Sequence, residues 1–223
     1  MMRRLRNLRL GTKVTEMTGA KRRLPASERR AQLIDAGRTV FAKRGYEATS
    51  MEEIADRAKV SKPIVYEHFG GKEGLYAVLV DREMDHVVTR IAEAITTGTP
   101  RERVERAALS FLSYVRDQPD GFVVLSRDAP VALARGGMSS LLNDVAERVA
   151  DVFTANFKRA GYDPKSAPIY AHALVGMVTF VGQWWTETRK PPIEEVASHL
   201  AALAWMGLRH LPKRPKLSLV PPA

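Results

Sequence analysis

Apolar side chains return every three or four residues along most of the chain, which predicts amphipathic α-helices. Prolines, glycines and capping residues separate these stretches into short and long helices. No segment shows the strict alternation expected of a half-buried β-strand, so the predicted fold class is all-α. The expected helices cover residues 26–44, 50–58, 61–69, 72–97, 100–118, 122–127, 138–160, 164–188 and 193–210.

The segment 50–69 predicts two short helices joined by a tight turn. Ser50 precedes Glu53 by three residues, the spacing of a capping box at the start of a helix. Ser61 is a second candidate N-cap, and Pro63 follows in the first helical turn, where its missing N–H has no cost. Two helices joined in this way form a helix-turn-helix unit.

The second helix of this unit has one apolar and one polar face. Val65 and Phe69 are four residues apart and anchor the helix inward. A helix of about eight residues is not stable alone in water, so neighbouring helices must hold it. An anchored helix with an outer polar and aromatic face suits the major groove of DNA. The outer face comprises Lys62, Pro63, Tyr66 and Glu67.

The sequence KPIVYEHFGGKEGLY at residues 62–76 resembles the signature of the TetR family of transcriptional regulators. The resemblance extends over roughly residues 27–79 and is carried by Tyr66, His68, Phe69, Lys72, Glu73 and Leu75. It implies that Lys62, Pro63 and Ile64 meet base edges. The residues expected at the phosphate backbone, which set register rather than sequence preference, are Thr49, Ser50, Ser61, Tyr66, His68 and Lys72. The alternative is that Tyr66 and His68 only stabilise a small helical core.

The chain has 223 residues and a net charge of +10, which is unevenly distributed. Residues 1–24 hold eight basic residues and one acidic residue, whereas residues 25–80 hold nine and eight. We expect a disordered basic arm over 1–24 and a disordered tail over 212–223. A basic arm can follow the DNA backbone or enter a minor groove, or it can be a solvated extension without contacts. Both readings remain open.

Several classes of protein are disfavoured. The absence of cysteine excludes disulfides and thiolate metal sites and agrees with a cytoplasmic protein. The apolar stretch 171–185 is shorter than the roughly 20 residues of a membrane span and reads as a buried helix. We find no catalytic motif or metal-ligand pattern, and therefore expect no enzyme, cofactor or metal.

Two helices near the C-terminus, expected at 164–188 and 193–210, are apolar on nearly all sides. Such helices are buried on more than one face, which favours a homodimer built on a four-helix interface over a monomer core. A dimer would place two recognition helices about 34–36 Å apart, on successive major grooves of an inverted-repeat double-stranded DNA site. Residues 25–71 would then be the DNA-binding domain, and 72–211 the effector-binding and dimerisation domain.

The expected effector is a small apolar molecule. Aromatic and methionine side chains on several helices could line a pocket if they converge, although each alone could be plain core: Phe111, Tyr114, Phe122, Phe153, Phe157, Met177, Phe180 and Trp184. The segments 174–177, 184–185 and 204–208 resemble actinobacterial TetR-type regulators of lipid metabolism, which implies a fatty acid or acyl-CoA. A multidrug-type ligand is the competing candidate. By family resemblance the protein would be a repressor released by this ligand. An architectural DNA binder without an effector is the alternative.

Overall fold

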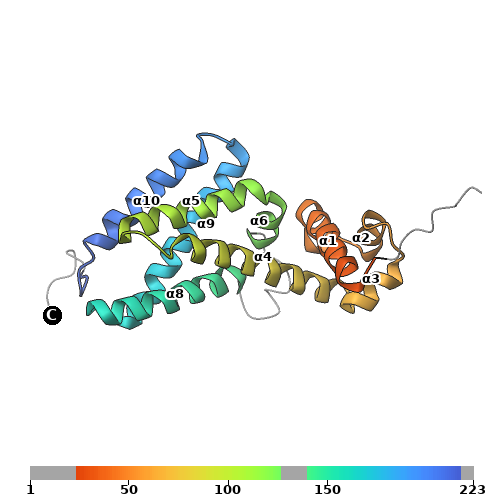
Figure 1. Ribbon diagram of the computed structural model, residues 1–223, viewed down its shortest axis with the longest axis horizontal. Coiled ribbons are helices and arrows are strands. Elements are labelled where there is room, and N and C mark those ends of the chain that lie inside the picture. Colours follow the sequence, from red (N-terminus) through yellow and green to blue (C-terminus); the bar gives the residue numbers. More distant parts are fainter. Residues whose placement is uncertain (1–23, 127–139, 217–223) are drawn as a thin grey trace, which may run out of the picture.

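The computed structural model describes residues 24–126 and 140–216, and within these ranges it contains helices and no strands (Figure 1). The all-α prediction is therefore confirmed. The helices are α1 (Ala26–Ala48), α2 (Met51–Arg57), α3 (Lys62–Phe69), α4 (Lys72–Ala94), α5 (Pro100–Asp117), α6 (Pro119–Ser126), α8 (Ser140–Ala160), the 3₁₀ turn η1 (Pro164–Ser166), α9 (Ala167–Thr188) and α10 (Ile193–Arg209).

The start of α2 confirms half of the expected capping box. The Ser50 hydroxyl accepts a hydrogen bond from the Glu53 N–H at 3.1 Å. The Glu53 carboxylate does not complete the box as predicted, because it accepts from Arg44 Nε at 3.2 Å. A full capping box instead begins α5, where Thr99 and Glu102 satisfy each other's backbone N–H groups.

The first hydrophobic core holds the helix-turn-helix half together. Leu33, Ile54, Val65 and Leu75 are fully buried and come from α1, α2, α3 and α4. Val124 of α6 belongs to the same core, so this half of the chain also packs on α6. The short helix expected at 122–127 begins earlier, at Pro119, because proline fits the first turn of a helix.

The second core is built by α5, α9 and α10 together with parts of α4 and α6. In Figure 1, α4 runs from the helix-turn-helix into this bundle. There α10 packs on α5, and α8 packs on α9. The second core includes Leu112, Val115, Phe122 and Leu200. No helix within the described ranges is long and apolar enough to cross a membrane.

Some expectations lie outside the described residues. They concern residues 1–23 of the basic arm, the first two residues of the helix expected at 138–160, and positions 217–223 of the tail. The division at residue 71 into two domains remains a prediction.

Candidate DNA-binding site

The recognition helix α3 is held by one buried side chain and presents an exposed face. Val65 is fully buried, whereas Lys62, Pro63 and Tyr66 are exposed. Ile64 is partly buried and packs against the first core, and its contact with bases remains a prediction. Glycine ends the helix, because Gly70 adopts φ +72°, a conformation that suits glycine.

Lys62 is held on this surface by two neighbours. Its ammonium pairs with the Glu52 carboxylate of α2 and lies 5.7 Å from the centre of the Tyr66 ring. The hydrogen bond between Lys62 and Glu52 raises the pKa of the lysine and lowers the pKa of the glutamate. Both side chains are exposed, so phosphate or base acceptors can compete with Glu52 for this lysine.

Lys72 does not extend toward DNA as the resemblance implies. Its Nζ donates to the carbonyl oxygens of Tyr46, Glu47 and Thr49 at 3.0, 3.2 and 3.2 Å. These carbonyls come from the end of α1 and the turn that follows it, where a cation is favourable. In this structure Lys72 therefore ties the start of α4 to the end of α1.

Thr49 points inward in this DNA-free structure, and its contact with a phosphate remains a prediction. Its side chain is 3% exposed, and its hydroxyl donates to the Gly45 carbonyl at 2.6 Å. Ser50 is exposed, but its hydroxyl caps α2. Ser61 begins α3 without a side-chain capping bond and is exposed, so its hydroxyl is available to a phosphate.

His68 lies at the edge of the recognition surface and is partly buried. Its carbonyl accepts from Arg30 Nη1 at 2.6 Å, and the same guanidinium lies 4.4 Å from the centre of the Phe69 ring. Sequence reasoning missed Arg30 as the clamp between α1 and α3. No local signal marks it, since its partner is 38 residues away.

Lys59 is a second residue that the sequence analysis missed. It occupies the turn between α2 and α3 with φ +55°, and its side chain is exposed. Non-glycine residues rarely adopt this left-handed conformation. A lysine at a strained turn of a helix-turn-helix adds positive charge beside the recognition helix.

The eight expected ligand residues do not gather in one place. Phe111 and Phe122 meet edge to face, 5.9 Å between ring centres, and pack around Gly182 of α9. Met177 lies partly buried against the same core. Tyr114 belongs to this core, but its hydroxyl donates to Glu83 rather than facing a cavity.

The other four expected ligand residues lie elsewhere. Phe153 and Phe157 contact each other, and Phe157 also contacts Tyr162 and Tyr170. Phe180 and Trp184 are 75% and 45% exposed, which contradicts their placement in an interior pocket. Both lie on one face of α9, as their spacing of four residues predicts.

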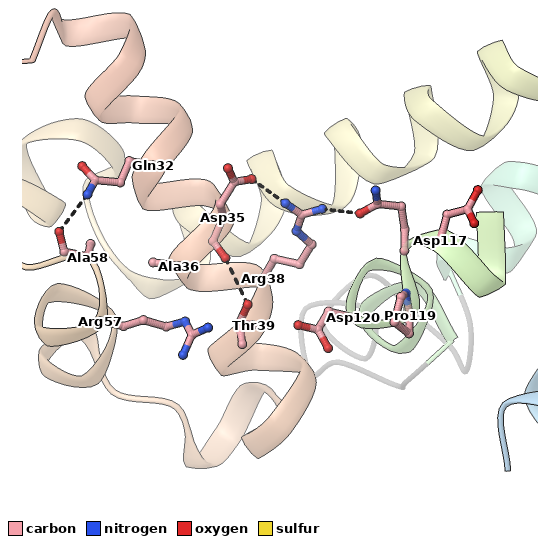
Figure 2. A pocket seen from close by; sticks show the side chains of 11 residues that line it. Gln32, Asp35, Ala36, Arg38, Thr39, Arg57, Ala58, Asp117, Pro119 and Asp120 are labelled. Atoms are coloured by element: carbon pink, nitrogen blue, oxygen red, sulfur yellow. Dashed lines mark hydrogen bonds and ion pairs between the residues drawn. The ribbon is translucent and has the colours of Figure 1, made fainter.

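A polar cleft lies between the two halves of the chain (Figure 2). It has a volume of about 620 Å³ and none of the eight expected ligand residues lines it. Its walls come from α1, α2 and the junction of α5 with α6, and include Asp35, Arg38, Arg57 and Asp120. The arrangement is too charged for an apolar ligand.

Two family models match this chain over most of its described length. The model of bacterial regulatory proteins of the tetR family matches residues 33–79, which contain the helix-turn-helix. The model named Tetracyclin repressor-like, C-terminal domain, matches residues 100–207. A relative from Mycolicibacterium smegmatis, the HTH-type transcriptional activator FasR, is 32% identical over 193 residues, covering 85% of this chain and 87% of FasR. The chain belongs to the TetR family.

Solved structures of TetR-family and related regulators share the fold. A TetR-like transcriptional regulator from Rhodococcus sp. RHA1 is 32% identical and superposes with a TM-score of 0.68, covering 84% of this chain and all of that one. The fatty acid degradation regulator FadR from Bacillus halodurans is 18% identical, with a TM-score of 0.69 over 85% of this chain and all of FadR. The latter likeness concerns the fold alone. Membership of the TetR family makes this chain a DNA-binding transcriptional regulator with a helix-turn-helix.

Proposed function

We propose that this TetR-family chain acts as a homodimer that reads an inverted-repeat operator, with α3 of each protomer in a major groove. The observation that carries the proposal is the exposure of Lys62, Pro63 and Tyr66 on a helix anchored by buried Val65. Lysine donates to guanine acceptors in the major groove, and an apolar proline can contact a thymine methyl group. Ser61 and Tyr66 would position the helix on phosphates.

The proposed dimer interface uses the exposed apolar side chains of α9 and α10. On α9, Ile169, Phe180 and Trp184 are 68%, 75% and 45% exposed. On α10, Leu203 and Met206 are 66% and 57% exposed. Large apolar side chains at this exposure on two neighbouring elements of the sequence indicate a surface that a partner covers. A second copy of the chain is the partner that an inverted repeat requires.

The proposed effector is a small apolar molecule, of which a fatty acid or acyl-CoA is the favoured class. Its proposed site is the aromatic core of α5, α6 and α9, where Phe111 and Phe122 pack around the small Gly182 and Met177 packs against the same core. The resemblance of the segments 174–177, 184–185 and 204–208 to actinobacterial regulators of lipid metabolism supports a lipid ligand. Insertion of an acyl chain there would displace Phe122 and the helix that carries it.

The proposed response is repression that the effector relieves. To shift occupancy from mostly bound to mostly released, the ligand must prefer the released form by about 5.5 kcal/mol. FasR is named an activator, so family membership does not determine whether this chain represses or activates transcription. A transcription assay on the selected operator decides between the two.

The test is a titration of the protein on its selected operator with palmitoyl-CoA, palmitic acid and a cationic dye, monitored by fluorescence anisotropy. Release by palmitoyl-CoA or palmitic acid supports the lipid proposal. Release by the dye alone would replace it with a multidrug-type ligand. Operator complexes that resist all three at concentrations near their solubility would contradict an effector of either class. An excess of random duplex DNA is the control, because an architectural binder would be displaced by it.

A further inference from the structure

Arg38 reaches from the DNA-binding half of the chain into the helices behind it. Its Nη1 donates to Gln118 Oε1 at 2.8 Å, at the end of α5, and lies 3.4 Å from Glu83 Oε1 of α4. Its Nη2 donates to Asp35 of its own helix, a contact visible in Figure 2. One guanidinium thereby joins α1 to two further helices, which its planar set of donors permits.

Glu83 is a carboxylate buried in the middle of this junction, with 2% of its surface exposed. Its Oε1 faces Arg38, and its Oε2 accepts a hydrogen bond from the Tyr114 hydroxyl at 3.0 Å. A buried carboxylate is costly unless it is both paired and hydrogen-bonded. Here the DNA-binding half supplies the cation and the effector half supplies the hydroxyl, so the burial of Glu83 depends on both halves keeping their places.

The backbone of α6 passes directly against this pair at Gly121. A Cβ atom at this position would lie 2.3 Å from Glu83 Oε2 and 2.7 Å from the Tyr114 hydroxyl oxygen. There is no space between the helix and the carboxylate. The next residue, Phe122, packs on Phe111 in the aromatic core. A shift of Phe122 is therefore conveyed through Gly121 to the carboxylate that holds Arg38.

The apolar contact between α1 and α6 cannot fix an orientation in the same way. Val124 joins the first core, and burial of apolar surface is non-directional, so it tolerates small sliding movements. An ion pair weakens with distance, most strongly where water is excluded. Movement of α1 away from Glu83 would leave a buried charge with only one partner.

We propose that Arg38 and Glu83 are positioning residues for DNA binding: they hold the helix-turn-helix half in one orientation against α4–α6 and thereby set the place of α3. This inference deepens the proposed function and rests on it for the effector step, in which displacement of Phe122 disturbs Glu83 and releases Arg38. Neither residue contacts DNA. Their effect is on how well the two recognition helices of a dimer match the spacing of their half-sites.

The first test measures orientation without DNA. The chain has no cysteine, so spin labels can be placed at Lys43→Cys on α1 and Asp151→Cys on α8 without other changes. Both positions are exposed. Pulsed electron paramagnetic resonance on labelled chains, diluted with an excess of unlabelled chain, reports the distance between the two halves within one protomer.

The variants are Arg38→Met, Arg38→Lys and Glu83→Gln, with Arg82→Gln as the matched control. Arg82 crosses the same junction to Asp35 at 3.7 Å, but both of those side chains are about half exposed. We expect the label distance to shift or broaden in Arg38→Met and Glu83→Gln, to recover partly in Arg38→Lys, and to stay unchanged in the control. Folded variants with wild-type distance distributions would overturn the proposal, whatever their thermal stability.

The second test compares the selected operator with a single half-site. Loss of orientation should lower affinity for the full operator by about 5- to 150-fold, the usual range of coupling between sites, and leave half-site affinity unchanged. An equal loss on both DNAs would indicate damage to the helix-turn-helix and would contradict a positioning role. Failure of the wild-type chain to select any operator would refute the proposed function instead, and the label distances would still decide the present inference.

Discussion

The Lys72 ammonium lies over the Tyr46 ring, 4.6 Å from its centre, and donates to the carbonyl oxygen of the same residue at 3.0 Å. Two further carbonyls, of Glu47 and Thr49, share this ammonium. A lysine that the family resemblance places at the phosphates therefore closes the end of α1 in the DNA-free structure. It stabilises the corner on which α4 leaves the helix-turn-helix.

Replacement of Lys72 should destabilise this corner. Lys72→Met keeps the length of the side chain and removes the charge, so we expect the free energy of unfolding to fall by about 1.5–3 kcal/mol, the range for hydrogen bonds to a charged group. Urea denaturation followed by circular dichroism measures the change. Lys43→Met, on an exposed position of α1, is the control and should change stability by less than about 0.5 kcal/mol. A Lys72→Met variant as stable as the control would refute the structural role.

Replacement of Lys59 by glycine should stabilise the fold, in contrast to the replacement of Lys72. Its φ of +55° is strained for an L-residue and comfortable for glycine. Lys59→Gly should therefore raise the free energy of unfolding by about 1 kcal/mol. Thermal unfolding measures this change. Arg189→Gly is a useful comparison, because Arg189 has φ +54° but its guanidinium also lies 5.0 Å from the Trp185 ring. The gain in the free energy of unfolding should therefore be smaller for Arg189→Gly than for Lys59→Gly. A loss of stability in Lys59→Gly would contradict the account of the turn between α2 and α3.

We expect ionisation of the buried Tyr76 hydroxyl to lower the stability of the fold at alkaline pH. Burial, with a smaller effect of Tyr46, raises the pKa of Tyr76 from 10.0 to about 12. The folded chain holds this proton more tightly than the unfolded chain does. The stabilisation is therefore fully present below pH 10 and is lost as the pH rises toward 12, by up to about 2.7 kcal/mol.

The measurement is the free energy of unfolding as a function of pH in the wild type and in Tyr76→Phe. The variant loses the hydrogen bond from the hydroxyl to the Val124 carbonyl, 3.3 Å long, and is less stable at neutral pH. Its stability should fall less steeply above pH 10. Buried Tyr114 also has a raised pKa, through burial first and the charge of Glu83 second, so some alkaline slope remains in the variant. Identical slopes in both proteins would contradict the assignment to Tyr76.

The exposed apolar side chains of α9 predict a dimer that a single charge disrupts. Phe180→Glu would place an unpaired carboxylate in the interface, at a cost of about 3–5 kcal/mol and at least about 100-fold in Kd. Sedimentation velocity measures the change. Leu109→Glu, which adds the same charge at an apolar residue of α5 that is 38% exposed, should remain dimeric. A wild-type chain that sediments as a monomer at micromolar concentration would refute the interface.

Sequence patterns predicted the features that depend on near neighbours. The inward anchor Val65 and the Ser50 cap of α2 each follow from residues within one or two turns, and the structure confirms them. The boundaries of α6 and of α4 differed by a few residues, since helix ends depend on packing as well as on local signals.

Contacts between distant parts of the chain were not predictable in this way. Composition cannot show that Lys72 turns back onto α1, or that Arg38 pairs with Glu83 across 45 positions. The exposed face of α9 shows the same limit: Phe180 and Trp184 fit an aromatic pocket and a dimer interface equally well on a helical wheel. Only the packing of α8 and α5 against the other faces of α9 separates the two uses.

The central claim is that α3 reads a symmetric DNA site as part of a dimer, and selection of bound duplexes from a random DNA pool tests it most directly. The account predicts an inverted repeat whose half-site centres are one helical turn, about 34–36 Å, apart or a multiple of that. It also predicts that Lys62→Ala and Tyr66→Phe weaken binding to the recovered site, because these residues form the exposed face of α3. Recovery of duplexes without a consensus, or of a consensus without two-fold symmetry, would contradict it.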